Sequence, residues 1–274
     1  MIGSGRNAGR SEAPGRFQRD RAPAPGHNLV SILAIHPHFG PGGLALALPL
    51  AAYAVIGEPL LGRWAYARLV RELRHDRTAL LRFYRLTLTV EWTWTVLIAA
   101  TLTVATDLNT SAVGLAVPAG PHLPAAAGTA AYMAVVVAVS SVILRRRASA
   151  GKVIPGHAAV AALLPSTSAE RRVAVAVAVT AGICEEVLYR GLLIALAIDL
   201  LGLSVIPAAV LAVAVFAAAH AYQGLSGVLA TGLLGAVLAG LYVSTGSLLL
   251  PIIVHVLVDL RGLVLVPLVA AARA

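Results

Sequence analysis

Cysteine is almost absent from the sequence, since Cys184 is the only one among 274 residues. A single cysteine excludes an intrachain disulfide framework and any metal site of the CxxC type. We interpret Cys184 as a small packing residue. Charged side chains are also scarce, at 12% of the chain against about 25% in an ordinary soluble domain.

Apolar residues make up 59% of the chain, and its mean hydropathy is +0.85. A fold of this size cannot hide so much apolar surface from water, so these values argue against a soluble globular protein. They also exclude a disordered chain, which would be polar and highly charged. Aromatic residues amount to only 5%. This scarcity argues against a nucleic-acid partner, because such binding combines a basic face with stacking aromatics or a reading helix.

The net charge of +9 is concentrated in three stretches, 1–28, 63–85 and 145–172, which hold five, seven and six of the 21 basic residues. Basic stretches that border apolar segments of about 20 residues are typical of a membrane protein that obeys the positive-inside rule. The rule predicts that 63–85 and 145–172 are cytoplasmic. It predicts that 107–123, which has no lysine or arginine, is external.

The apolar pattern predicts an all-α fold, a polytopic transmembrane helix bundle with about seven spans. The predicted spans are 41–58, 86–106, 124–144, 172–198, 203–222, 225–243 and 247–268. Residues 1–28 are rich in arginine, glycine and proline, and we expect a disordered tail there. The Arg-rich stretch 63–85 is predicted to be a surface helix at the lipid headgroups. Its aromatic residues are Trp64, Tyr66, Phe83 and Tyr84.

Three ionisable residues lie inside the fourth predicted span, namely Glu185, Glu186 and Arg190. Each costs about 2.5–3.5 kcal/mol at the centre of a bilayer, so partners, water or a shallow position must offset the cost. Glu186 and Arg190 are four residues apart and can pair on one helix face, which would be a purely structural role. Glu185 has no obvious partner in its own span.

Two further spans carry such groups, because the fifth ends with Phe216-x-x-x-His220 and the seventh contains His255-x-x-x-Asp259. Taken alone, His220 could be a buried core histidine, and the second pair could be a structural hydrogen bond. Ionisable residues in spans usually face the bundle interior or a water-filled cavity, so their coincidence in three spans predicts a polar chamber in the membrane. Its members would be Glu185, His220, His255 and Asp259. Such a chamber can perform general-base chemistry on water.

In this order the three motifs resemble those of the CPBP intramembrane protease family, also called the type II CAAX prenyl protease or Abi family. The resemblance covers roughly residues 150–268. It implies an intramembrane endopeptidase in which Glu185 and His220 activate the water that attacks a peptide carbonyl. It also implies that His255 and Asp259 stabilise the oxyanion, while Glu186 and Arg190 support the site by ion pairing.

The resemblance divides the chain into three parts. These are the tail 1–28, N-terminal membrane spans with a basic cytoplasmic loop over 29–147, and a protease-like core over 148–270.

Asp259 departs from the pattern of many family members, which have asparagine at the matching position. An ionised aspartate would repel a developing oxyanion, whereas an amide or a protonated carboxyl could donate a hydrogen bond to it. Asp259 must therefore be neutral, orient His255, or ligate a metal. Two histidines and a carboxylate could bind zinc. We nevertheless expect no metal and no other cofactor, since the His-x-x-x-His pairing of zinc proteases is absent.

The sequence alone leaves two other functions open. One is a non-catalytic membrane scaffold or bacteriocin-immunity-type protein, and the other is a proton-coupled carrier. We expect the partners to be a peptide or membrane-protein substrate and the lipid bilayer. The Arg- and Ala-rich composition favours a bacterial plasma membrane. The sixth span has a small-residue stripe, Gly232, Ala236 and Gly240. The stripe predicts close helix packing, with a homodimer contact as the alternative.

Overall fold

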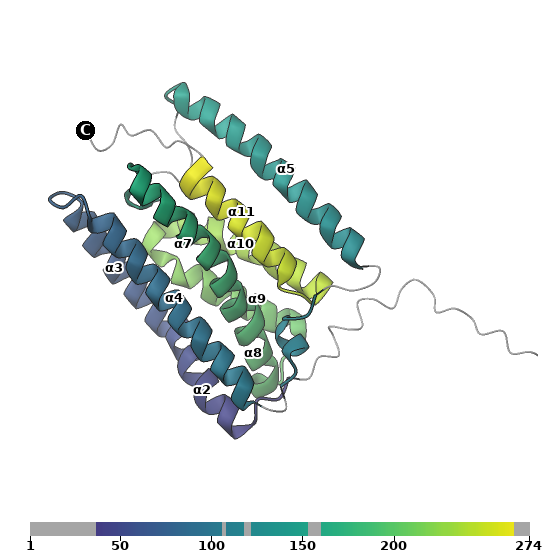
Figure 1. Ribbon diagram of the computed structural model, residues 1–274. Helices are drawn as coiled ribbons and strands as arrows, with labels where there is room; N and C mark the ends of the chain where they lie inside the picture. Colours follow the sequence, from purple (N-terminus) through teal and green to yellow (C-terminus); the bar gives the residue numbers. More distant parts are fainter. Residues whose placement is uncertain (1–36, 106–107, 118–121, 153–159, 266–274) are drawn as a thin grey trace, which may run out of the picture.

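The computed structural model describes residues 37–105, 108–117, 122–152 and 160–265, and every regular element within them is helical (Figure 1). In chain order these elements are α2 (Gly40–Ala52), η2 (Tyr53–Gly57), α3 (Glu58–Glu72), α4 (Ala79–Val104), η3 (Thr110–Val113), α5 (His122–Ser149), η4 (Ala161–Leu163), α7 (Ser168–Glu186), η5 (Val187–Leu193), α8 (Ile194–Leu201), α9 (Val205–Ala219), η6 (Ala221–Gln223), α10 (Gly224–Thr245), α11 (Leu249–Leu260) and η7 (Arg261–Leu265). This arrangement confirms the all-α bundle. The predicted tail over 1–28 lies outside the described residues.

Each of the seven predicted spans corresponds to a helix. Within the described residues, four helices are long and apolar enough to cross a membrane, namely Gly40–Glu72, Ala79–Val104, Ala127–Arg147 and Ala221–Thr245. The continuous helix formed by α7, η5 and α8 is also long, but it contains the three ionisable residues of the fourth predicted span. Exposed leucines on α10, such as Leu225, Leu229 and Leu233, are 66% to 76% exposed, as expected for a face that contacts lipid.

The prediction of a surface helix over 63–85 is wrong. Residues Gly40–Glu72 form one helix and α4 begins at Ala79, so the Arg-rich stretch forms two helix ends and the turn between them. Tyr84 does not lie at a surface, because it is buried and its hydroxyl donates a hydrogen bond to the Leu163 carbonyl at 2.5 Å. One helix therefore ends and the next begins within the stretch that its arginine content alone would assign to a single surface helix.

Ion pairs close the turn between α3 and α4. The Arg82 guanidinium contacts Glu72 at 2.6 Å and Asp76 at 2.5 Å. A hydrogen bond from the Thr78 amide, together with Arg82, holds the pKa of Asp76 at about 2. Asp76 therefore stays ionised at neutral pH and can pair with Arg82, which lies in the first turn of α4.

The basic stretches 63–85 and 145–172 reach the same end of the bundle. Figure 1 shows the turn between α3 and α4, the C-terminal end of α5 and the N-terminal end of α7 together at the upper left. This agrees with the prediction that 63–85 and 145–172 face the same side of the membrane. The assignment of that side to the cytoplasm stays a prediction.

Helix α7 lies at the centre of the bundle, between α4 and α11 (Figure 1). It begins with a capping box in which the Thr167 side chain accepts a hydrogen bond from the Glu170 amide, and the Glu170 carboxylate accepts one from the Thr167 amide. Further along, α7 and α11 approach closely at Gly182, where an added Cβ would lie 2.9 Å from the backbone nitrogen of Val256. This contact brings the glutamates of α7 next to His255 on α11.

The small-residue stripe on α10 is only partly a packing surface. An added Cβ at Gly240 would meet nothing within 4 Å in the described structure, and Ala236 is exposed. At Gly232 it would make an ordinary contact with Ala217 at 3.5 Å. The close approach instead uses Gly235, where a Cβ would lie 2.9 Å from the Phe216 ring. The packing prediction is therefore wrong at Gly240 and Ala236, and the homodimer stays a prediction.

The substitution Gly182→Ala is expected to destabilise the bundle by about 1–3 kcal/mol, because the new methyl group would press on the backbone of α11. Gly240→Ala is the matched control, and it is expected to be neutral or to stabilise by about 0.5–1 kcal/mol, since its Cβ is unobstructed and alanine favours helix. Unfolding of both variants in detergent micelles by denaturant titration measures the difference. Equal stability of the two variants would contradict the close α7–α11 contact.

Candidate active site

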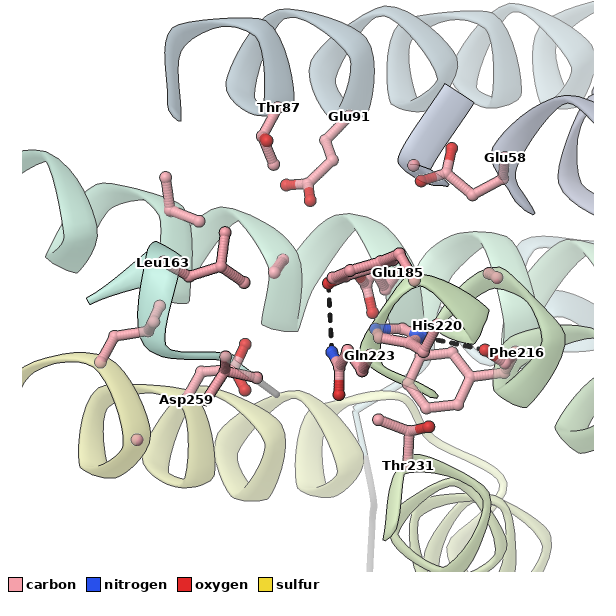
Figure 2. Close-up of a pocket in the computed structure, with 18 of the residues that line it drawn as sticks. Glu58, Thr87, Glu91, Leu163, Glu185, Phe216, His220, Gln223, Thr231 and Asp259 are labelled. Carbon is pink, nitrogen blue, oxygen red and sulfur yellow. Dashed lines mark hydrogen bonds between the residues drawn. The ribbon is translucent and has the colours of Figure 1, made fainter. Parts of the chain in front are cut away.

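A cavity of about 450 Å³ lies inside the bundle, between α3, α4, α7, α10 and α11 (Figure 2). Its volume is within the range of roughly 300–1,000 Å³ that is common for small-molecule sites. All four residues of the predicted chamber line it, namely Glu185, His220, His255 and Asp259. Residues from three separate predicted spans therefore meet at one cavity. Most of the remaining lining is apolar, with leucine, valine and alanine side chains.

Glu186 lies directly behind this cavity and contacts both Arg190 and His255. Its Oε1 accepts a hydrogen bond from Nη1 of Arg190 at 2.7 Å and lies 2.7 Å from Nδ1 of His255. The side chains of Glu186, Arg190 and His255 are 0%, 1% and 4% exposed. The sequence prediction of a Glu186–Arg190 pair is confirmed, and the contact with His255 extends that pair to a second span.

The Arg190 guanidinium has two other partners. Its Nη2 donates to the Gly235 carbonyl of α10 at 3.1 Å, and its Cζ lies 4.6 Å from the centre of the Phe216 ring. Arg190 belongs to η5, a π-helical turn that interrupts the long helix. Such turns are frequent at functional sites. Arg190 thus connects its own helix to α9 and α10.

The contact with Glu186 determines which atom of His255 faces the cavity. A carboxylate accepts hydrogen bonds, so Nδ1 of His255 carries the proton and donates it to Glu186. The other nitrogen, Nε2, lies 3.8 Å from Oε2 of Glu185 and 3.7 Å from Oδ2 of Asp259. His255 therefore presents Nε2 between the two carboxylates of the cavity.

The helix end of α9 orients His220. The His220 amide bonds to the Ala217 carbonyl, and Nδ1 of the imidazole lies 2.9 Å from the Phe216 carbonyl (Figure 2). Because a carbonyl can only accept, Nδ1 carries the proton, and Nε2 is left with a lone pair. The Phe216 ring packs against this imidazole with its centre 4.7 Å away. His220 thus has the tautomer that a general base or a hydrogen-bond acceptor needs.

Glu185 and Asp259 are less enclosed than His255. Their side chains are 14% and 28% exposed. Oε2 of Glu185 has no hydrogen-bond partner within the described part of the chain, although it is buried. No ion pair joins Asp259 to Arg261 among the described residues, while Arg261 itself lines the cavity. Oε2 of Glu185 can therefore accept a hydrogen bond from a group that enters the cavity.

Sequence reasoning missed two carboxylates of the cavity lining. Glu58 begins α3 and Glu91 lies in the middle of α4, and both line the cavity from the side opposite Asp259 (Figure 2). The sequence does indicate both residues, because Glu91 falls inside the predicted span 86–106 and Glu58 is the last residue of the predicted span 41–58. An ionisable residue in a span indicates a functional position by default. Cys184 is buried, as expected for a packing residue.

The cavity residues do not fit a metal centre. In the described part of the chain, no group of three or more histidine, cysteine, aspartate or glutamate side chains is arranged to hold a metal ion. The Nδ1 atom of His255 is committed to Glu186, which leaves that imidazole one nitrogen. The absence of a metal and of any other cofactor stays a prediction.

The fold and the cavity together define a helical membrane bundle with an internal cavity that is lined by carboxylates and histidines. Residues 168–261, which are 94 of the 274, match the model of a protein family described as type II CAAX prenyl endopeptidase Rce1-like. The match confirms the family resemblance predicted from the three motifs, and it shows that this part of the chain is similar to CAAX-protease-like peptidases. No curated protein and no solved structure matches the chain.

Removing the arginine of the buried cluster tests its energetic role. Arg190→Met is expected to destabilise the bundle by about 3–5 kcal/mol, because it leaves the Glu186 charge buried with one partner fewer. Arg68→Met is the control, since Arg68 and Glu72 form an exposed pair at 2.6 Å that contributes about 0–1 kcal/mol. Denaturant titration of both variants in detergent measures the two losses. A loss for Arg190→Met as small as that of the control would contradict the buried cluster.

Proposed function

We propose that this chain is an intramembrane endopeptidase that hydrolyses peptide bonds inside the cavity. The observation that carries the proposal is the meeting of Glu185, His220 and His255 at one cavity, with the Glu186–Arg190 pair behind them. The family match over residues 168–261 supports a peptidase of this class.

In the proposed reaction, Glu185 and His220 hold and activate the attacking water. Nε2 of His220 has a free lone pair, and Oε2 of Glu185 is buried without a hydrogen-bond partner among the described residues. Both atoms can accept a proton from water, which is the role of a general base. The water oxygen forms a bond to the carbonyl carbon while its proton moves to this pair.

His255 is proposed to stabilise the oxyanion that forms on the carbonyl oxygen. Glu186 favours a proton on Nδ1 and stabilises a positive charge on the imidazole, as the aspartate of a catalytic triad does. Nε2–H of the charged ring then donates to the developing oxyanion. The tetrahedral intermediate breaks its C–N bond, and the leaving nitrogen takes the proton held by the base. The products are a new carboxyl terminus and a new amino terminus.

Asp259 is proposed to orient His255 rather than to contact the oxyanion. Its Oδ2 lies 3.7 Å from Nε2 of His255, close enough to attract the charged ring. This role needs no hydrogen bond from aspartate to the substrate. It also accounts for a carboxylate where many family members have asparagine.

The proposed setting is a bacterial plasma membrane, and the proposed substrate is a peptide or membrane protein. The apolar lining of the cavity and the four membrane-length helices support a substrate that approaches within the bilayer. The Arg- and Ala-rich composition with a single lysine supports the bacterial source.

Glu185→Gln and His220→Ala are each expected to lower cleavage by about a hundred- to ten-thousand-fold, because each removes a proton acceptor from the attacking water. The measurement is mass spectrometry of peptides released from a membrane-protein pool by purified protein in liposomes. Cys184→Ala is the matched control, since Cys184 is the buried neighbour of Glu185 and has no part in the mechanism.

Unchanged cleavage by the Glu185 or His220 variant would refute the mechanism. If the unmodified protein cleaves nothing, and cells that carry Glu185→Gln behave like cells that carry the unmodified protein, the result would favour a scaffold. Uptake into liposomes that depends on a proton gradient would favour a carrier.

A further inference from the structure

The part of the chain before the family match contributes an acidic wall to the cavity. Glu58 from α3 and Glu91 from α4 line it together with Glu185 and Asp259. In Figure 2 the side chain of Glu91 points from α4 toward the cavity, and that of Glu58 extends into the same space. We call Glu58 and Glu91 the acidic wall. The reaction proposed above uses neither residue.

Of these two residues, Glu91 is the one whose burial most needs an explanation. The residue is only 4% exposed, and its Oε2 has no hydrogen-bond partner within the described residues. A buried polar atom without a partner costs free energy, so such atoms in native structures call for an explanation. No side chain of the described residues forms an ion pair with Glu91. A group that enters the cavity can supply the missing partner.

Glu58 is held in place by its own helix. The Tyr53 hydroxyl donates a hydrogen bond to Oε2 of Glu58, across the π-helical turn η2. The Tyr53 ring in turn packs against Trp94 with the ring centres 5.5 Å apart. Trp94 is 4% exposed and also lines the cavity. The acidic wall therefore stands beside a tryptophan ring, the side chain that attracts cations most strongly through its face.

The charges of the cavity lining are strongly unbalanced. Of the residues that the structure describes, four with carboxyl side chains line it, against one arginine, Arg261, and no lysine. Among the described residues Arg261 forms no ion pair, and Arg190 is committed to Glu186 and to the Gly235 carbonyl. Carboxylates gathered in a site of low dielectric repel one another, and a cation that enters between them relieves this repulsion.

We propose that Glu91, with Glu58, recognises a cationic side chain of the substrate, lysine or arginine, close to the bond that is cut. This inference rests on the proposed endopeptidase function. The substrate class is then an apolar peptide segment with one basic residue. The apolar part fits the leucine, valine and alanine lining, and the basic residue faces the acidic wall.

Two synthetic peptides test the inference directly. Both are Leu/Ala-rich segments of about 20 residues, long enough to enter a bilayer, and they differ only at one central position, which is lysine or norleucine. Their binding is measured by fluorescence to the full-length His220→Ala variant in liposomes, where cleavage is slow. The lysine peptide is expected to bind about tenfold more tightly, which corresponds to about 1.4 kcal/mol.

Glu91→Gln in the same background is expected to remove most of this preference, since glutamine keeps the size of the side chain but not its charge. Glu58→Gln is the second variant and should reduce the preference even if Glu91→Gln fails to fold. Glu72→Gln is the matched control, because Glu72 pairs with Arg68 and Arg82 outside the cavity. Equal binding of both peptides, or a preference that survives both cavity substitutions, would overturn the inference.

Cleavage of the same peptides by the unmodified protein separates this inference from the proposed function. Faster cleavage of the lysine peptide supports both. A binding preference without cleavage of either peptide supports the acidic wall and contradicts the endopeptidase. Equal binding and equal cleavage support the endopeptidase and contradict the acidic wall.

Discussion

The structure depends on one buried carboxylate, that of Glu186. Its Oε1 is shared by Arg190 and His255, each at 2.7 Å, and all three side chains are withdrawn from solvent. A lone carboxylate at this depth would be expensive, and so would a lone guanidinium. Because neither charge can be left unpaired, α7, η5 and α11 must lie where the cluster forms. The ion cluster thereby fixes the relative position of the helices that carry the site.

The same cluster sets the tautomer and the orientation of His255. It fixes the proton on Nδ1 of His255 and turns Nε2 toward Glu185 and Asp259. On the other side, the Phe216 carbonyl fixes the proton on Nδ1 of His220 and leaves Nε2 free. Two imidazoles are thus held in defined tautomers, one by the Glu186 carboxylate and the other by the Phe216 carbonyl. One is suited to carry a positive charge, and the other is suited to accept a proton.

Much of this arrangement follows from the sequence, because ionisable residues are costly in apolar helices. The cost alone indicates that Glu185, His220 and His255 share one cavity, and the four-residue spacing indicates the Glu186–Arg190 pair. Glu91 could have been found by the same rule. The contact between Glu186 and His255 could not, because it depends on the α7–α11 packing. Charge density alone also misassigned 63–85, where Arg82 closes a turn between two helices instead of marking a surface helix.

The central claim is that the cavity activates water for attack on a peptide bond. Cleavage by purified protein in liposomes prepared in ¹⁸O-labelled water tests this claim most directly, with mass spectrometry of the released peptides. The account predicts one labelled oxygen in each new carboxyl terminus and the loss of labelled product in Glu185→Gln. Labelled product formed equally by Glu185→Gln, or peptides released without the label, would contradict it.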